Sequence, residues 1–309
     1  MSLVFGERFL RDPDLFPARQ AGQAWGDRSV AVDFAGGPYV VTGLSAEQET
    51  AVRGRFAGFC VEATAVRERV ECRAFRAARE EFVSIDPRGF ELTLDLDHLE
   101  RAVRVSGLGL MARLEWRPTL SAGLWTAWPD DDAFPGAIEN VLRVIAAYRL
   151  AEEGGALLHS AGIVEDGGAW LFVGHSGAGK TTLSRLSLAE GRSVLSDDLN
   201  AVLPSAAGHV VSPVPFAGDY RGSARAVLAL AAVCQLRHGD RHEVSPLSPA
   251  EGLAALVAAA PYLNRDPYRV ERLLSNLERI AGSSPVRRLT FALAGGVWET
   301  MADGLGARA

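Results

Sequence analysis

The chain has 309 residues, of which 48% are hydrophobic and 23% are charged. Such a length predicts about two domains, and this composition excludes a disordered, collagen-like or coiled-coil protein. The net charge is −6, and the arginines are scattered among acidic residues instead of forming a stripe, which argues against a nucleic-acid partner.

The basic residues are almost all of one type. The chain has 32 Lys and Arg residues, and Lys180 is the one lysine among them. Because no structural rule replaces every surface lysine by arginine, we attribute the skew to a genome rich in G and C. The neighbours of Lys180 must then decide whether the exception has a chemical reason.

The cysteines and the hydrophobic runs predict a cytoplasmic protein without a membrane partner. Cys60, Cys72 and Cys234 form no CxxC pair, and one of them stays unpaired in any disulfide scheme, which fits a reducing compartment. The first residues lack a basic region followed by an apolar core, and no run approaches 18 apolar residues. We therefore expect neither a signal peptide nor a membrane span.

Residues 1–134 are predicted to form a smaller, strand-rich α+β domain for binding the acceptor or a partner. Residues 1 to about 45 mix Gly and Pro with short apolar runs, which leaves open a strand-containing lead-in or a loosely held arm. Ser45 is a candidate N-cap, so a helix is predicted from there to about Phe59. Alternating apolar and polar residues then predict a mostly antiparallel sheet, with strands at 81–85, 90–96, 110–116 and 123–128.

The domain boundary is placed near Pro135, and residues 135–309 form the second predicted domain. The run of three aspartates at 130–132 resembles a metal cluster, but prolines flank it, so an exposed turn and helix cap is favoured. Residues 137–153 have apolar side chains at helical spacing and end at Gly154-Gly155. The pattern predicts an amphipathic helix that introduces this domain.

The elements that follow are predicted from turn and cap signals. Glu165-Asp166-Gly167-Gly168 joins two apolar segments, 156–164 and 169–173, as a hairpin. Ser248-Pro249 begins a helix that reaches about Ala259. Further along, the sequence predicts a helix at 266–280, a strand at 286–293 and a short helix at 297–301.

The surroundings of the single lysine match a phosphate-binding loop. Residues 174–181 read Gly-His-Ser-Gly-Ala-Gly-Lys-Thr, which fits the pattern G-x-x-x-x-G-K-[ST]. An apolar strand precedes the loop and a helix follows it, in the order that the motif requires. The predicted nucleotide-binding residues are Gly174, His175, Ser176, Gly177, Ala178, Gly179, Lys180, Thr181 and Thr182.

Phosphate chemistry explains these residue types. Glycines let consecutive backbone N–H groups turn toward phosphate oxygens, and the start of the helix adds a partial positive charge. Lys180 reaches the β- and γ-phosphates as a mobile point charge, which is a reason for lysine here in an arginine-rich chain. Thr181 offers a hydroxyl to Mg²⁺. The alternative is a glycine-rich turn with a structural role only.

Two more sets of residues are candidates for chemistry. Asp197 and Asp198 follow a short apolar strand, so one carboxylate can bind metal while its neighbour accepts a proton; the alternative is a capped turn. His159 lies on an apolar strand, where a buried core histidine is the ordinary alternative. His238 and His242 are four residues apart with Gly239-Asp240 between them, which favours solvated loop histidines over a metal pair.

Three segments together resemble a known family. The runs Leu158-His159-Ser160-Ala161-Gly162, Gly174 to Thr182 and Ser196-Asp197-Asp198 look like the catalytic domain of HPr kinase/phosphorylase and its relatives, and more remotely like ATP-dependent phosphoenolpyruvate carboxykinase. The resemblance covers about residues 135–302, although its specific motifs occupy far fewer positions. The antiparallel hairpin before the loop is also unlike GTPases and motor ATPases.

The resemblance implies a role for each matching residue. His159 matches the family's active-site histidine, Lys180 its phosphate-binding lysine and Thr181 its metal-binding hydroxyl. Asp197 matches the residue that takes the proton from the acceptor hydroxyl. The metal ligands that accompany Thr181 are Asp198 and Asp219.

The chain also departs from the family. Ser160 replaces the usual glycine after the histidine, and the long Gly- and Arg-rich signature of the bifunctional enzymes is not recognisable. HPr binding and the reverse phosphorolysis are therefore not expected. Arg221 is a candidate phosphate or acceptor contact, with an ordinary surface arginine as the alternative.

The sequence thus predicts an α/β fold: a P-loop kinase domain of the HPr-kinase/phosphoenolpyruvate-carboxykinase type, preceded by the smaller strand-rich domain. The expected activity is transfer of the γ-phosphoryl group of ATP, with Mg²⁺, to a hydroxyl, and the resemblance points to a serine of a protein or peptide. The alternatives are a small-molecule kinase and a nucleotide-binding sensor or scaffold without transfer activity. Oligomerisation is compatible with the sequence.

Overall fold

The structure is a computed structural model that describes residues 3–5, 22–62, 70–77, 83–85, 94–107, 109–126, 133–216, 218–220 and 226–305. Contacts divide the chain into two compact units, Met1–Arg149 and Leu150–Ala309. The boundary predicted near Pro135 lies at the start of helix α3 (Ala133–Glu152), and the chain passes from one unit to the other within this helix. Each unit is built around its own large sheet.

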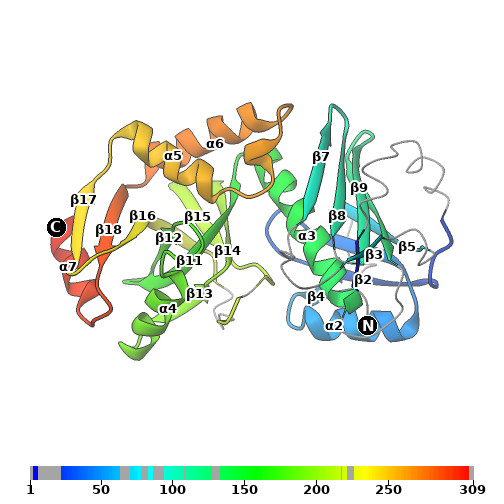
Figure 1. The fold of residues 1–309 in the computed structure, drawn as a ribbon, viewed down its shortest axis with the longest axis horizontal. Helices are drawn as coiled ribbons and strands as arrows, with labels where there is room; N and C mark the ends of the chain where they lie inside the picture. The colour runs from blue at the N-terminus through cyan, green and yellow to red at the C-terminus, as the bar shows by residue number, and fades with distance from the viewer. Residues whose placement is uncertain are drawn as a thin grey trace. The chain divides into compact units, whose positions relative to one another are not determined.

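The first unit contains a mixed sheet of eight strands (Figure 1). Its strands are β2 (Arg28–Val32), β3 (Tyr39–Leu44), β4 (Cys60–Val61), β5 (Val70–Arg76), β7 (Asp95–Leu99), β8 (Ala102–Gly107), β9 (Leu110–Trp116) and β10 (Leu120–Thr126). They lie in the order β4-β2-β3-β5-β10-β9-β8-β7. Neighbouring strands are antiparallel except that β5 runs parallel to β3 and β10, so the sheet is mostly antiparallel, as predicted. The predicted strand at 81–85 is not part of it, and residues 81–82, 90–93 and 127–128 of the predicted strands lie outside the described residues. Separately, β1 (Leu3–Phe5) pairs with β6 (Val83–Ile85).

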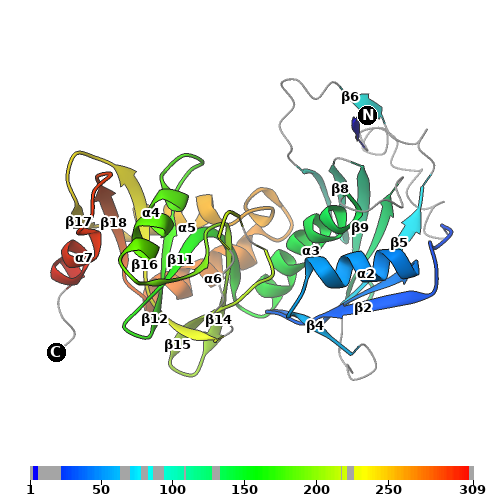
Figure 2. The same cartoon turned by 90° about the horizontal axis from the view of Figure 1, so that it is seen from below.

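Two helices lie side by side against this sheet, α2 (Ala46–Arg55) and the first part of α3 (Figure 2). The predicted cap of α2 is confirmed: the Ser45 hydroxyl accepts the N–H of Gln48, and the Gln48 side chain accepts the N–H of Ser45. The helix ends at Arg55, before the predicted end at Phe59. An ion pair between Arg55 and the buried Glu139 joins α2 to α3.

The second unit also contains eight strands in one sheet system. They are β11 (Ala156–Glu165), β12 (Gly168–Val173), β13 (Ser193–Ser196), β14 (Leu199–Ser205), β15 (Gly208–Ser212), β16 (Leu228–His238), β17 (Glu243–Pro246) and β18 (Val286–Phe291). The main order is β12-β11-β14-β15-β16-β18-β17, and β13 pairs with β11. The predicted hairpin is confirmed, since β11 and β12 are antiparallel with Glu165 opposite Gly168.

Strand β16 connects the two ends of this order. It pairs in parallel with β12 as well as with β18, so β12, β11, β14, β15 and β16 close into a ring of pairings. In the parallel pair, Val173 at the end of β12 lies opposite Gln235 of β16. The chain therefore leaves both strands at the same edge of the sheet.

Four α-helices accompany this sheet: α4 (Lys180–Ala189), α5 (Pro249–Ala259), α6 (Val270–Ser283) and α7 (Val297–Leu305), with a short 3₁₀ turn, η5 (Leu263–Arg265), before α6. Figure 1 shows α4 on one side of the strands and α5 with α6 on the other. The helix predicted from the Ser248-Pro249 signal is confirmed, with a complete capping box. The helix predicted at 266–280 begins four residues later, because Asp266 caps a turn instead.

The predicted fold class is wrong. The structure has two large mixed sheets of eight strands each and few helices, which is not a P-loop α/β kinase fold. The first unit is the shorter of the two, as predicted, but its sheet has as many strands as the sheet system of the second. A strand-loop-helix pattern is a local signal, whereas the fold depends on which distant strands pair. That local pattern contains no information on the antiparallel pairings of β13, β14 and β15.

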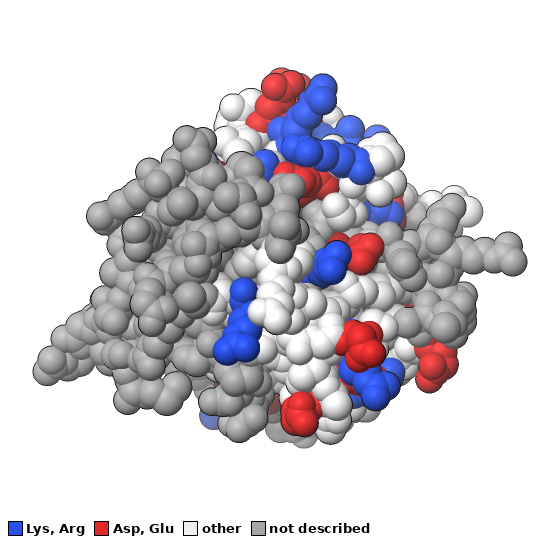
Figure 3. Space-filling model, turned by 90° about the vertical axis from the view of Figure 1, so that its right-hand side faces the viewer, with Lys and Arg blue, Asp and Glu red and all other residues white. Residues whose placement is uncertain are grey.

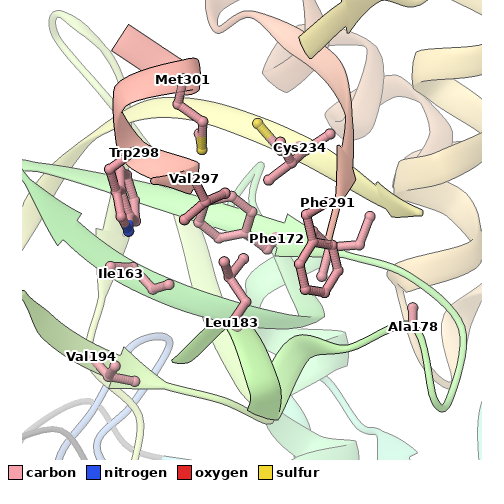
Figure 4. Packing of buried hydrophobic residues seen from close by; sticks show 13 residues of the cluster. Ile163, Phe172, Ala178, Leu183, Val194, Cys234, Phe291, Val297, Trp298 and Met301 are labelled. Atoms are coloured by element: carbon pink, nitrogen blue, oxygen red, sulfur yellow. The ribbon is translucent and has the colours of Figure 1, made fainter. Parts of the chain in front are cut away.

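The core beside the phosphate loop is formed by side chains from seven elements (Figure 4). Helix α7 contributes Val297, Trp298 and Met301, and the Trp298 ring meets the ring of Phe172 from β12 edge to face, with 5.8 Å between their centres. The buried members of this cluster are Ala161, Ile163, Phe172, Ala178, Leu183, Val194, Cys234, Leu236, Leu289, Phe291, Val297, Trp298 and Met301. Because Ala178 belongs to the loop itself, this core fixes the loop to the sheet.

Trp298 is the most connected member of the core. Its indole N–H donates to the Ser187 hydroxyl at 2.9 Å, and the guanidinium of Arg192 lies 4.7 Å from its ring centre. Arg192 also forms two hydrogen bonds with the Glu165 carboxylate, at 2.8 and 3.0 Å. This arrangement joins α4, α7 and the end of the β11–β12 hairpin through a planar, bidentate cation.

Charges on the first unit are mixed. On the face shown in Figure 3, basic side chains lie beside acidic ones instead of forming a field of one sign. Arg113 and Arg117 both pair with Glu115, and Arg104 pairs with Asp97. Searching the helices within the described ranges finds none with the length and apolarity needed to cross a membrane.

Trp298→Ala should lower the free energy of unfolding of the second unit by about 3–5 kcal/mol, because it removes a fully packed aromatic side chain and its hydrogen bond. Urea denaturation measures the loss. Leu293→Ala is the matched control, since Leu293 is 76% exposed and its loss should stay within about 0.5 kcal/mol. Equal effects of the two substitutions would contradict the assigned core.

The cap of α5 should make stability depend on pH. Hydrogen bonds from the Ser248 backbone and hydroxyl, with help from Arg288, lower the pKa of Glu251 from its ordinary value of 4.5 to about 2. A lowered pKa stabilises the fold above pH 4.5, and the contribution is lost as the pH falls toward 2. Glu251→Gln should therefore be less stable than the wild type at pH 6 and equally stable near pH 2; a difference that does not change with pH would contradict this.

Candidate functional site

The segment between β12 and α4 has the geometry of a phosphate loop. Strand β12 ends at Val173, and α4 begins at Lys180 with Gly179 as its N-cap. Gly177 and Gly179 have φ angles of 78° and 97°, in the left-handed region that favours glycine. A Cβ at Gly179 would lie 2.4 Å from the ring of the buried Phe291, so this position has no room for a side chain.

Several N–H groups of the loop are free to bind an anion. Within the described chain, the N–H of Ala178 donates to the carbonyl of His175 at 3.0 Å, and that of Leu183 to Gly179 at 2.8 Å. The N–H groups of Gly177, Gly179, Lys180, Thr181 and Thr182 have no such acceptor in the part of the protein that the structure describes. Donors that converge at a helix N-terminus form an anion-binding cradle, so the loop fits phosphate.

Lys180 is folded back on the loop. Its ammonium donates to the carbonyl oxygens of Gly174 at 2.9 Å and of His175 at 3.2 Å. The residue is buried, and burial lowers the pKa of its ammonium, while the Asp198 carboxylate acts in the opposite direction. The ammonium therefore remains close to the loop and needs only a rotation of its side chain to reach an anion there.

Asp197 and Asp198 occupy an interruption in one extended strand. Strands β13 and β14 both run antiparallel to β11, and the register of β13 against β11 shifts between Gly162 and Ile163. The Ser196 hydroxyl holds the interruption, since it accepts the N–H groups of Asp198 and Leu199. An interruption of this kind redirects side chains from the sheet surface.

The Asp197 carboxylate is buried and held on both oxygens. Its Oδ2 accepts the hydroxyl of Thr181 at 3.2 Å, and its Oδ1 accepts the N–H of Tyr220 at 3.1 Å. Gly218 lies so close that a Cβ there would approach Oδ1 to 2.8 Å. The loop after β15 therefore wraps this carboxylate, which is 5% exposed as a residue.

His159 and Asp198 form a second pair at the site. The Nδ1 atom of His159 lies 2.9 Å from the backbone oxygen of Asp198 and 3.1 Å from its carboxylate Oδ1. A carbonyl oxygen only accepts, so Nδ1 carries the hydrogen and Nε2 is the basic nitrogen. The His159 side chain is 41% exposed, so it is not the buried core histidine that we considered as the alternative.

One cavity of about 400 Å³ brings these groups together. His159 lies in it with the loop and with the Asp pair, although the three come from distant parts of the sequence. The cavity is lined by His159, Ser176, Gly177, Gly179, Lys180, Thr181, Thr182, Asp197, Asp198, Gly218, Asp219 and His238. The predicted loop residues Gly174, His175 and Ala178 do not line it; Ala178 is buried in the core. Arg221 and the aspartates at 130–132 lie outside the described residues.

His238 lies at the site, although its sequence pattern did not indicate this. Its Nε2 lies 2.8 Å from the carbonyl oxygen of Gly177, and it lines the cavity. His242 is directed elsewhere, with Nε2 3.1 Å from the carbonyl oxygen of Gly295. His238 is exposed, as predicted, and His242 is partly buried; their Nε2 atoms bond to different carbonyl oxygens. Their contacts depend on how β16 pairs with β12 and β18, which their spacing in the sequence does not reveal.

The residues fit Mg²⁺ as a partner of bound phosphate. Among the described residues no group of three or more His, Cys, Asp or Glu side chains could hold a metal ion by itself. Mg²⁺ commonly uses one or two protein ligands together with substrate phosphates and water. The Thr181 hydroxyl and the Asp197 carboxylate lie together beside the loop, whereas Asp198 is engaged by His159.

Two other cavities contain none of the predicted site residues. One of about 250 Å³ lies on the sheet of the first unit, where Arg73, Arg113 and Trp125 are among its lining residues. The other, of about 510 Å³, lies between α5 and α6. Neither contains a glycine-rich loop or a pair of carboxylates beside a lysine, so the cavity at the phosphate loop is the candidate site.

Comparison with protein families identifies the chain. The model of the family described as SynChlorMet cassette protein ScmC matches residues 131–305. This match covers more than half of the 309 residues, so the chain belongs to the ScmC family. No curated protein matches the chain.

The family predicted from the motifs is wrong. The segments at 158–162, 174–182 and 196–198 resemble HPr kinase/phosphorylase and ATP-dependent phosphoenolpyruvate carboxykinase, but the matching family is ScmC. Motifs this short follow from the chemistry of phosphate binding, and the same chemistry recurs in unrelated proteins. They predict what a loop can bind, and they do not determine the family.

Gly179→Ala should destabilise the protein more than Gly177→Ala. Both residues have positive φ angles, so either substitution strains the backbone by about 1 kcal/mol or more. A Cβ at Gly177 meets open space, whereas one at Gly179 meets the Phe291 ring, and such overpacking adds about 1–3 kcal/mol. Chemical denaturation compares the two variants, and equal losses would contradict this description of the loop.

Proposed function

We propose that this chain is an ATP- and Mg²⁺-dependent phosphotransferase that moves the γ-phosphoryl group of ATP to a hydroxyl. The observation that carries the proposal is the convergence in one cavity of a phosphate loop, its lysine and two adjacent carboxylates. Binding a nucleotide requires only the loop and Lys180. The acidic residues and His159 opposite them are the groups that a transfer reaction needs in addition.

The phosphate loop would bind the nucleotide. The N–H groups of Gly177, Gly179 and Lys180, together with the Lys180 ammonium, would bind the phosphates and stabilise the charge that develops on the transferring group. Mg²⁺ would be held by the Thr181 hydroxyl and the Asp197 carboxylate, and it supplies charge neutralisation on the phosphates. This support comes from the 3.2 Å contact between Thr181 and Asp197.

The His159–Asp198 pair would take the proton from the acceptor hydroxyl. The sequence predicted Asp197 as the general base, but this buried carboxylate is held by Thr181 and Tyr220 and would serve as the Mg²⁺ ligand. His159 has its Nδ1–H oriented by Asp198, which makes Nε2 an acceptor. The acceptor oxygen then bonds to the γ-phosphorus, the bond to the bridging oxygen breaks, ADP leaves, and the proton passes to Nε2.

The size of the site favours a side-chain hydroxyl as the acceptor. Pockets for whole small molecules span roughly 300–1,000 Å³, and the 400 Å³ cavity must also accommodate the phosphates of the nucleotide. A serine presented on a protein or peptide needs to insert only one short side chain. This supports a polypeptide acceptor over a small-molecule acceptor.

Mg²⁺·ATP should raise the melting temperature of the wild-type protein, and Lys180→Ala should abolish the increase. Lys180→Arg keeps the charge, but we expect it to bind ATP at least about tenfold more weakly, because a planar guanidinium does not match two carbonyls and a phosphate as a mobile ammonium does. Thermal shift and calorimetry measure both effects. Without stabilisation of the wild type, the proposed nucleotide site is wrong.

Asp198→Asn and His159→Gln should retain ATP binding while transfer to peptide falls by at least about 100-fold, in line with loss of general base catalysis. Transfer is measured with γ-labelled ATP and a degenerate serine-containing peptide library, with the same library lacking hydroxyl residues as the control. Asp197→Asn should instead raise the Mg²⁺ concentration that half-maximal transfer requires, because it removes a proposed Mg²⁺ ligand. Binding without transfer by the wild type would make the protein a nucleotide sensor, and loss only in Asp197→Asn would restore Asp197 as the base.

A further inference from the structure

His238 reaches the phosphate loop from a neighbouring strand. It is the last residue of β16, and its Nε2 lies 2.8 Å from the carbonyl oxygen of Gly177. The carbonyl can only accept, so Nε2 carries the hydrogen and donates it. The ring packs against Phe291 at 5.6 Å between ring centres, with an angle of 32° between the planes.

The position of His238 is fixed by the sheet. In the parallel pair of β16 and β18, His238 lies opposite Phe291, and the next residue, Gly239, donates its N–H to the Phe291 carbonyl at 3.1 Å. Phe291 is 1% exposed. The imidazole therefore packs on the buried Phe291 ring, and its N–H points at the Gly177 carbonyl.

The hydrogen bond from His238 to the Gly177 carbonyl holds one peptide group of the loop. In a trans peptide the carbonyl of Gly177 and the N–H of Ala178 point in opposite directions. His238 holds the first of these groups, and the His175 carbonyl holds the second at 3.0 Å. With both ends held, the peptide cannot rotate. The neighbouring residues Gly177 and Gly179, which line the cavity, are restrained with it.

We propose that His238 is a positioning residue for the phosphate loop: it holds the peptide between Gly177 and Ala178 so that the loop amides are arranged for phosphate before the nucleotide binds. The inference rests on the proposed function, because it concerns the same nucleotide site. A loop that is ordered beforehand loses less conformational freedom on binding, which strengthens affinity without any new contact to the ligand.

The chain offers a matched control four residues away. His242 lies on the far side of the same turn, and it also bonds to backbone: its Nε2 lies 3.1 Å from the Gly295 carbonyl, and its Nδ1 accepts the N–H of Ala292 at 3.4 Å. His242 does not line the cavity at the loop. Substituting it therefore removes similar bonds from this turn without touching the loop.

The test measures the dissociation constant of Mg²⁺·ATP by calorimetry in four full-length proteins. His238→Phe keeps a ring on Phe291 but has no donor, so binding should weaken by about 3- to 10-fold, as expected for one lost hydrogen bond. His238→Gln keeps an N–H donor of similar reach and should stay within about twofold of the wild type. His242→Phe should bind like the wild type.

Hydrogen exchange provides a measurement that does not need the nucleotide. In the ligand-free proteins, the amide of Ala178, which donates to the His175 carbonyl, should exchange faster in His238→Phe than in the wild type, His238→Gln or His242→Phe. Melting temperatures check that each variant folds. Should the Phe variant fail to fold, His238→Asn, whose amide is too short to reach the carbonyl, takes its place.

The outcomes separate this inference from the proposed function. If the wild type binds Mg²⁺·ATP and His238→Phe binds it equally well, the positioning role is wrong. Equal losses in the Phe and Gln variants would also overturn it, because the ring and not the donor would then matter. If the wild type does not bind Mg²⁺·ATP, the proposed function fails, and the exchange rates alone decide whether His238 holds the loop.

Discussion

The parallel pairing of β12 with β16 is the contact on which the rest of the site depends. Strand β12 is antiparallel to β11 on one side and parallel to β16 on the other. Because parallel neighbours end at the same edge, the phosphate loop after β12 emerges beside the end of β16, where His238 lies. Strand β11 carries His159 and, along its other side, the interrupted strand with Asp197 and Asp198. Residues from four segments thus meet through the parallel pair of β12 and β16 and the antiparallel partners of β11.

The loop is held by the core below it as well as by hydrogen bonds to its own backbone. Ala178 is packed among the buried side chains that α7 covers, and Gly179 has no space for a side chain because Phe291 fills it. The same Phe291 supports the ring of His238. Because close packing passes a displacement of one side chain on to its neighbours, α7 and the phosphate loop form one rigid unit. Trp298, with its bond to Ser187 of α4, extends this unit along the helix that begins at the loop.

Local chemistry could be predicted from the sequence, but the fold and the family could not. The helix caps at Ser45 and Ser248, the β11–β12 hairpin and the strand-loop-helix order around Lys180 all lie within short segments, and all are present in the structure. Long-range pairing decides the rest. The closed ring of β11, β12, β14, β15 and β16 requires contacts between residues as far apart as Ala169 and Leu230, which no local pattern encodes. His238 illustrates the limit: its residue type and neighbours favoured a loop histidine, and only the sheet reveals its bond to Gly177.

The single lysine has a structural reason that base composition cannot supply. Lys180 is 7% exposed, and its ammonium fits between two carbonyl oxygens, those of Gly174 and His175. A guanidinium has five donors in a rigid plane, and most of them would be left without acceptors in so confined a place, which is costly for a buried charge. An ammonium satisfies the two carbonyls and can rotate away from them, because its long stem is flexible. Arginine, which serves as the basic residue everywhere else in the chain, therefore does not satisfy the steric and hydrogen-bonding constraint at position 180.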